Sequence, residues 1–250
     1  MIIAAVGFDV LMFIAALLAG AIASIAGFGI GSLLTPLLAM SVGTKMAIAA
    51  VSIPHLTGTA IRFWKLRRDL DRRVLWSFGV TSAAGGLTGA LLNAGTSSPR
   101  LTIALGALLI VTGANGLLGL TRRLTFHGPL AWIAGGASGF FGGLVGNQGG
   151  LRSAALLGFD LSRDAFVATA TAIGLFVDGA RMPVYLIVEG RNLLRIVPII
   201  AVTTVGVIAG TLAGTRLLRR VPNAMFLRLV SALIVILGFY MLGRGAGRWQ

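Results

Sequence analysis

Three side chains that could bind an ion or move a proton share one face of a predicted helix. Asp178, Arg181 and Tyr185 stand at positions i, i+3 and i+7 of an apolar run, and this spacing places them on one side of a helix. Asp178 is the only acid deep in such a run, so it is either the structural counter-ion of Arg181 or a proton carrier. Arg181 lies toward the end of its run, so its side chain could alternatively extend to the membrane–water interface.

A second run carries a similar face. His55, Thr59 and Arg62 stand at i, i+4 and i+7. His55 could relay protons, because an imidazole titrates near neutral pH; the alternative is an ordinary hydrogen bond between helices. Thr57 falls off this face. We expect Asp178, His55 and Thr59 to be the residues that couple transport to an ion, if coupling exists.

A polar cluster follows a glycine-rich segment in the second half of the chain. Asn147, Gln148 and Arg152 interrupt apolar sequence there. Amide and guanidinium donors are suited to an oxyanion, and an arginine at membrane depth is tolerated when it faces a cavity or a counter-charge. The alternative is that Arg152 extends its side chain into interfacial water.

Two glycine-rich breaks, at residues 27–31 and 146–150, each precede a short apolar run. Broken helices present N-terminal N–H groups, which favour anions. The alternative role of the glycines is close helix packing, which fits Gly135, Gly139 and Gly143 better. The predicted substrate-binding residues are Gly27, Gly29, Gly31, Asn147, Gln148, Gly149, Gly150, Arg152, Arg181 and Tyr185.

The composition restricts the class of protein. Of 250 residues, 56% are hydrophobic and 11% are charged, with a mean hydropathy of +0.94; a soluble domain has roughly 25% charged residues. The net charge of +14 lies in short gaps between apolar runs, as in membrane proteins, so no nucleic-acid partner is expected. The absence of cysteine, the two histidines and the lack of a nucleotide or hydrolase motif predict no metal, no cofactor and no enzyme.

The order of apolar runs repeats. Each half has a long run, a glycine break, a short run and three further long runs. Gly85-x-x-x-Gly89 matches Gly206-x-x-x-Gly210 at an offset of about 120 residues. We therefore predict an all-α polytopic membrane protein of two homologous repeats, 1–124 and 125–250, each with four long transmembrane helices plus a short glycine-broken half-helix.

Basic residues constrain the orientation. Residues 62–73 hold six Lys or Arg and two acids, which predicts a cytoplasmic segment. Arg122 and Arg123, and also Arg219 and Arg220, fall on the same side only if each short run takes the chain across the membrane. The repeats are then inverted and both termini external. The alternative is that the short runs re-enter without crossing, since 7–11 residues are few for a span.

The segments Gly27-Phe-Gly-Ile-Gly-Ser-Leu-Leu-Thr-Pro36, Gly85-Gly-Leu-Thr-Gly89 and Gly142-Gly-Leu-Val-Gly-Asn-Gln-Gly-Gly150 resemble the TauE/SafE sulfite-exporter family. The likeness covers nearly the whole chain. Asn147, Gln148 and Arg152 depart from the family's usual glycine and aliphatic residues. The resemblance implies transport of a small sulfur-containing or carboxylate anion, such as sulfite or an organosulfonate.

Together these features predict a secondary transporter in the lipid bilayer of a bacterial inner membrane, either a monomer or a homodimer. It would move its anion by alternating access, coupled to protons or to the membrane potential. Two short helices that meet at the midplane are also found in pores, so an uncoupled channel is the alternative.

Overall fold

The computed structural model describes residues 2–119, 129–217 and 223–247, and every regular element in these ranges is helical. This confirms the predicted all-α class. The predicted boundary at residue 124 lies outside the described residues, as do Arg122, Arg123, Arg219 and Arg220. In chain order the α-helices are α1 (Ile2–Ala26), α2 (Ile30–Val42), α3 (Thr44–Leu66), α4 (Arg72–Val74), α5 (Val80–Gly95), α6 (Ser98–Leu118), α7 (Pro129–Val145), α8 (Gly149–Leu156), α9 (Arg163–Leu193), α10 (Val197–Leu217) and α11 (Asn223–Gly245).

Shorter helical turns lie between some of these helices. A 3₁₀ turn at Arg67–Asp69 follows α3, a π-helical turn at Leu75–Gly79 joins α4 to α5, and a 3₁₀ turn at Leu194–Ile196 joins α9 to α10. The order within each half is therefore a long helix, a short helix after a glycine break, and three more helical passes. At 1.5 Å per residue, α2 and α8 are about 20 Å and 12 Å long.

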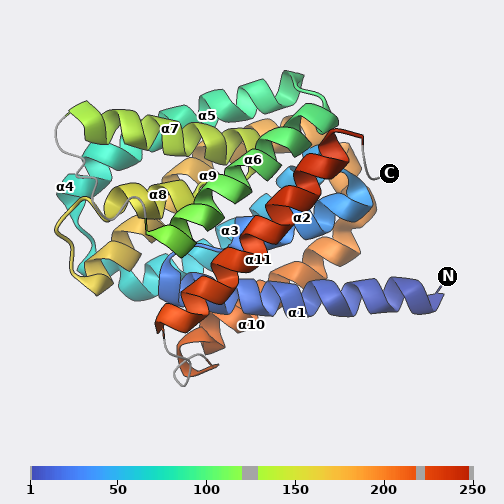
Figure 1. Cartoon of the computed structure of the whole chain (residues 1–250), viewed down its shortest axis with the longest axis horizontal. Helices are drawn as coiled ribbons and strands as arrows, with labels where there is room; N and C mark the ends of the chain where they lie inside the picture. Colours follow the sequence, from blue (N-terminus) through green and yellow to red (C-terminus); the bar gives the residue numbers. More distant parts are fainter. Residues whose placement is uncertain (1, 120–128, 218–222, 248–250) are drawn as a thin grey trace.

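The chain folds back on itself at both breaks. Gly27 ends the first long helix at φ 76° and Gly146 ends its counterpart in the second half at φ 73°, a conformation that a residue with a side chain adopts rarely. Beyond the turn, Gly29 lies against Ile22 of α1 and Gln148 lies against Gly142 of α7. Figure 1 shows α2 returning toward the end of the bundle where α1 begins.

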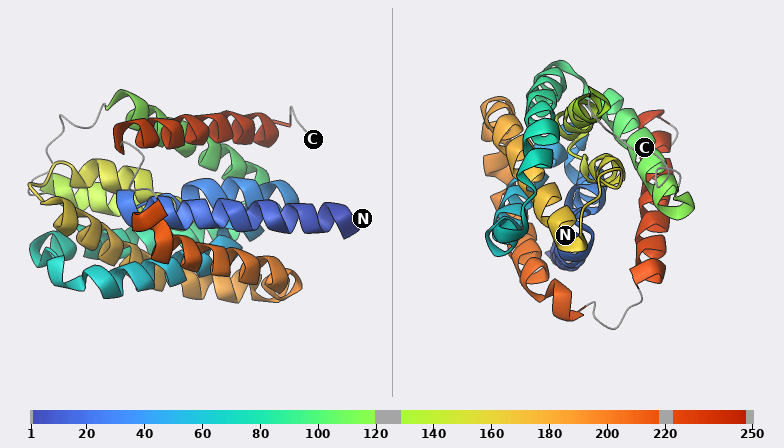
Figure 2. Two further views of the ribbon diagram at one scale, coloured as in Figure 1. Left: turned by 90° about the horizontal axis from the view of Figure 1, so that it is seen from below. Right: turned by 90° about the vertical axis from the view of Figure 1, so that its left-hand side faces the viewer.

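Small residues hold the long helices together in two equivalent pairs. Gly85 and Gly89 of α5 lie directly on the backbone of α7, and Gly206 and Gly210 of α10 lie on the backbone of α1. Gly139 of α7 faces the backbone of Ser82 in return. The predicted packing role of the glycines in α7 is confirmed. In the end-on view of Figure 2, α6 and α11 line one side of the bundle, opposite α5, α9 and α10.

The outside of the bundle is apolar. Five helical segments of the described chain are long and apolar enough to cross a membrane, and α2 and α7 are shorter apolar helices. One of the five segments, the 51 residues Asp164–Gly214, contains most of α9 and α10. Trp64, Trp76 and Trp132 are more than half exposed, as aromatic side chains at a membrane interface are. These features identify a multi-pass membrane protein.

The structure corrects the extent of the basic segment. Residues 67–73 lie at the end of the bundle where α4 is drawn (Figure 1), opposite the end where α1 begins and α11 ends. Arg62 does not belong with them, because α3 continues to Leu66 and the Arg62 side chain is 3% exposed. Charge pattern alone grouped Arg62 with its exposed neighbours.

Candidate functional site

The two glycine breaks lie side by side and antiparallel inside the bundle. A Cβ atom on Gly31 would collide with the carbonyl oxygen of Gly146, and one on Gly149 would collide with Cβ of Phe28. Close approach of two backbones requires glycine here. The N-terminal ends of α2 and α8 are thereby brought together.

The second break is shorter than the sequence indicated. Gly146, Asn147 and Gln148 form it, and α8 already begins at Gly149. Gly150 packs against Thr112 of α6, and Gly31 likewise belongs to a helix, α2. Close packing accounts for Gly31, Gly149 and Gly150, and a substrate-lining role for these glycines remains a prediction.

Arg152 of α8 lies in the middle of this region. Its side chain is 1% exposed, so the alternative that it extends into interfacial water is wrong. Its Nη2 donates to the carbonyl oxygen of Gly27 at 3.2 Å, which ties α8 to the first break. Its Nε and Nη1 have no hydrogen-bond partner among the described residues. Buried donors without partners are costly, which is a sign of a site that accepts a ligand.

Asn147 and Gln148 add further unpartnered groups beside Arg152. The Asn147 Oδ1 accepts a hydrogen bond from the Ser32 hydroxyl at 2.9 Å, which leaves its Nδ2 without a partner in the described chain. Both polar atoms of the Gln148 side chain are also unpartnered there. The two side chains are 2% exposed. Most of the free groups of this cluster are donors, the kind that an anion requires.

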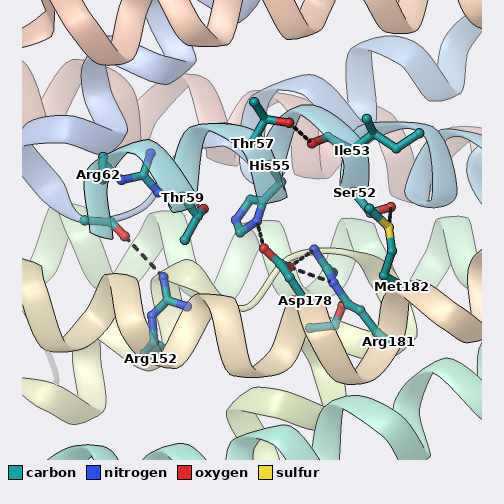
Figure 3. A network of polar contacts seen from close by, with 12 residues as sticks. Ser52, Ile53, His55, Thr57, Thr59, Arg62, Arg152, Asp178, Arg181 and Met182 are labelled. Carbon is teal, nitrogen blue, oxygen red and sulfur yellow. Dashed lines mark hydrogen bonds and ion pairs between the residues drawn. The ribbon is translucent and has the colours of Figure 1, made fainter. Parts of the chain in front are cut away.

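A hydrogen-bonded group centred on Asp178 lies between α3 and α9 (Figure 3). Asp178 Oδ2 is 2.7 Å from Nδ1 of His55, and its Oδ1 accepts from Nε and Nη2 of Arg181 at 3.1 and 2.8 Å. All three side chains are buried. The predicted face of α9 and the predicted face of α3 therefore meet, and Thr57 points away from it (Figure 3).

Arg181 and Tyr185 are fully engaged with neighbouring groups. Arg181 Nη1 donates to the carbonyl of Gly142, and the Tyr185 hydroxyl donates to the carbonyl of Gly143. Arg181 is 1% exposed, so it does not reach the interface. These bonds fix the end of α7 before the break. They favour a positioning role, and direct substrate contact by either residue remains a prediction.

Sequence reasoning did not include Arg62 among the site residues. Its Nη2 donates to Thr59 Oγ1 at 3.0 Å, and its Nε and Nη1 have no partner among the described residues. The helical spacing from His55 was the available signal. Hydroxyls without a partner in the described chain also went unpredicted, at Thr35, Ser153, Thr171 and Thr211.

Comparison with known protein families gives a match over most of the chain. The sulfite exporter TauE/SafE family matches residues 12–241, which is most of the chain. Neither a curated protein nor a solved structure matches it. The matched range includes both glycine breaks and all the buried charged residues described above.

Proposed function

The chain belongs to the sulfite exporter TauE/SafE family, whose members are membrane transporters of sulfur anions, and from this premise we propose that its substrate binds between the two glycine breaks. The observation that carries this proposal is Arg152. A guanidinium buried at membrane depth with two unpartnered nitrogens is unfavourable by about 2.5–3.5 kcal/mol on insertion scales, and a bound anion would offset that cost.

The charges around Arg152 support an anionic substrate. The charged side chains buried in the described bundle are Arg62, Arg152, Arg181 and Asp178, with His55 beside them. Asp178 compensates one arginine, so two positive charges remain uncompensated when His55 is neutral. The N-terminal ends of α2 and α8 add partial positive charge. A small oxyanion such as sulfite fits this balance best, and organosulfonates and carboxylates share its chemistry.

The arrangement of the breaks supports alternating access. The antiparallel breaks and the equivalent pairs α1–α10 and α5–α7 are what two inverted repeats related by a two-fold axis would give. In this proposal α2 and α8 each cross the membrane, for ten passes in all, and residues 67–73 face the cytoplasm of a bacterial cell. Substrate access would alternate as the two halves rock about the breaks.

Proton coupling is the part of the proposal carried by His55 and Asp178. Their hydrogen bond joins α3 to α9, the two helices whose equivalent faces meet at the site. Protonation of Asp178 would weaken its ion pair with Arg181, whereas protonation of His55 would place a new cation beside Asp178. Either change would alter the balance of charges that holds these helices together. Thr59, on the same face of α3, would act through its contact with Arg62.

The test is sulfite flux into proteoliposomes that contain purified protein. We expect saturable uptake by the wild type. Arg152→Gln should reduce sulfite uptake at least about tenfold, because hydrogen bonds to charged groups contribute about 1.5–3 kcal/mol. Arg100→Gln, which removes an exposed arginine, should leave uptake unchanged. Equal uptake by wild type and Arg152→Gln would exclude the proposed site.

The same vesicles distinguish a coupled transporter from a channel. Accumulation of sulfite above its external concentration, driven by an imposed pH gradient and lost in Asp178→Asn, would support proton coupling. Flux that only equilibrates sulfite and ignores the pH gradient would favour the uncoupled channel. A channel is the second candidate function because two short helices that meet inside a bundle also form pores.

A further inference from the structure

Arg62 has the same local geometry as Arg181 but lacks a counter-ion on its own helix. Arg181 binds the carboxylate of Asp178, three residues earlier on α9. Arg62 binds the hydroxyl of Thr59, three residues earlier on α3. Arg62 is 3% exposed and Arg181 is 1% exposed. A hydroxyl satisfies one donor of Arg62 and leaves its charge uncompensated.

The correspondence between these pairs follows from the two breaks. Gly27 and Gly146 end equivalent helices with nearly the same φ, 76° and 73°, and they are 119 residues apart. The same offset aligns Thr59 with Asp178 and Arg62 with Arg181. One half of the bundle therefore carries an internal carboxylate at a position where the other half carries a threonine.

Arg152 approaches this position from the other side. A Cβ atom on Gly174 would be 3.1 Å from Nη1 of Arg152 and 3.3 Å from Cγ2 of Thr59, so both side chains lie against Gly174 of α9. Thr59 in turn contacts Arg62. Figure 3 shows Arg152 reaching toward the part of α3 that carries Thr59 and Arg62. The two cations repel each other, and each has Nε and Nη1 unpartnered in the described chain.

We propose that Arg62 and Arg152 bind one oxyanion together beside Thr59, and that the anion takes the place which the carboxylate of Asp178 occupies against Arg181. Thr59 is then the specificity-determining residue, because its uncharged side chain gives Arg62 a hydrogen bond but no counter-ion. An oxyanion with two or more acceptor oxygens can bridge the two guanidinium groups, and two uncompensated positive charges match a dianion better than a monoanion. The inference rests on the proposed function and adds Arg62 and Thr59 to it.

The test supplies Arg62 with the missing carboxylate. In Thr59→Asp the new side chain would pair with Arg62 as Asp178 pairs with Arg181 and would repel an incoming anion. We expect the sulfite affinity of the purified protein, measured by isothermal titration calorimetry in detergent, to fall at least about tenfold. Thr59→Asn has nearly the same shape as Thr59→Asp without the charge, and it should bind sulfite more tightly than Thr59→Asp does.

Thermal unfolding gives a second readout of the same variants. Without sulfite, Thr59→Asp should melt no lower than Thr59→Asn, since it neutralises a buried cation. Sulfite should raise the melting temperature of the wild type and of Thr59→Asn but not that of Thr59→Asp. If Thr59→Asp does not fold, Arg62→Gln takes its place, with the exposed Lys65→Gln as its control, and the same tenfold loss is expected.

These measurements distinguish failure of the proposed function from failure of the role given to Arg62 and Thr59. A wild-type protein that binds no sulfite would overturn the proposed function itself. Loss of binding in Arg152→Gln with wild-type affinity in Thr59→Asp, or in Arg62→Gln, would leave the proposed function standing and overturn the role of Arg62 and Thr59.

Discussion

Substitution of Gly139 by alanine should separate two helices that the fold requires to be in contact. A Cβ atom at this position of α7 would lie 2.6 Å from the carbonyl carbon of Ser82 in α5 and closer still to its oxygen, whereas ordinary contact begins near 3.4 Å. The obstacle is backbone, so a side-chain rotation cannot relieve it. Overpacking of this kind costs about 1–3 kcal/mol.

The same helix provides the control. A Cβ atom on Gly136, one turn earlier in α7, would meet its nearest neighbour at 3.9 Å. Gly136→Ala should therefore be neutral, or more stable by up to about 1 kcal/mol from helix propensity. The assay is the free energy of unfolding in micelles titrated with sodium dodecyl sulfate. We expect Gly139→Ala to be less stable than Gly136→Ala by about 2 kcal/mol or more.

Equal stability of these two variants, or the reverse order, would refute the packing of α5 on α7. Gly210→Ala extends the test to the other half, because a Cβ atom there would lie 2.8 Å from the carbonyl carbon of Leu17 in α1. A loss similar to that of Gly139→Ala is expected if the pairs α1–α10 and α5–α7 are equivalent.

Two further predictions concern the hydrogen-bonded group around Asp178. Asp178→Asn should lower the free energy of unfolding by about 3–5 kcal/mol, because it leaves Arg181 buried without a counter-ion. The double variant Asp178→Asn with Arg181→Met should recover part of this loss. If Asp178→Asn alone is as stable as the wild type, the ion pair is contradicted. Tyr185→Phe removes the hydrogen bond to the Gly143 carbonyl and should cost about 1 kcal/mol with an unchanged KM for sulfite, whereas a raised KM at wild-type stability would identify Tyr185 as a substrate ligand.

Much of the helical order could be predicted from the sequence, because glycine and charge mark where apolar runs end. The breaks predicted at residues 27–31 and 146–150 follow directly on the ends of α1 at Ala26 and α7 at Val145. The start of α8 was missed. Gly149 and Gly150 resemble a break in composition, but they are helical residues kept small by Phe28 and Thr112.

The polar contacts of the site were less accessible to sequence reasoning. Helical spacing identified the faces of His55 and Asp178, but their contact joins residues 123 positions apart, and no periodicity encodes such a contact. Hydropathy also cannot distinguish a buried arginine from an interfacial one. Arg62 was therefore assigned to the basic segment that follows it, although the bundle encloses it.

The most direct test of the central claim is to locate a bound oxyanion. Selenate has the shape and charge of sulfate, and its selenium can be found by anomalous diffraction in crystals of the wild-type protein. We expect a selenium peak inside the bundle beside the paired breaks, with the selenate oxygens within hydrogen-bonding range of Arg152. Selenate found only on the basic segment 67–73, with no peak near Arg152, would contradict it.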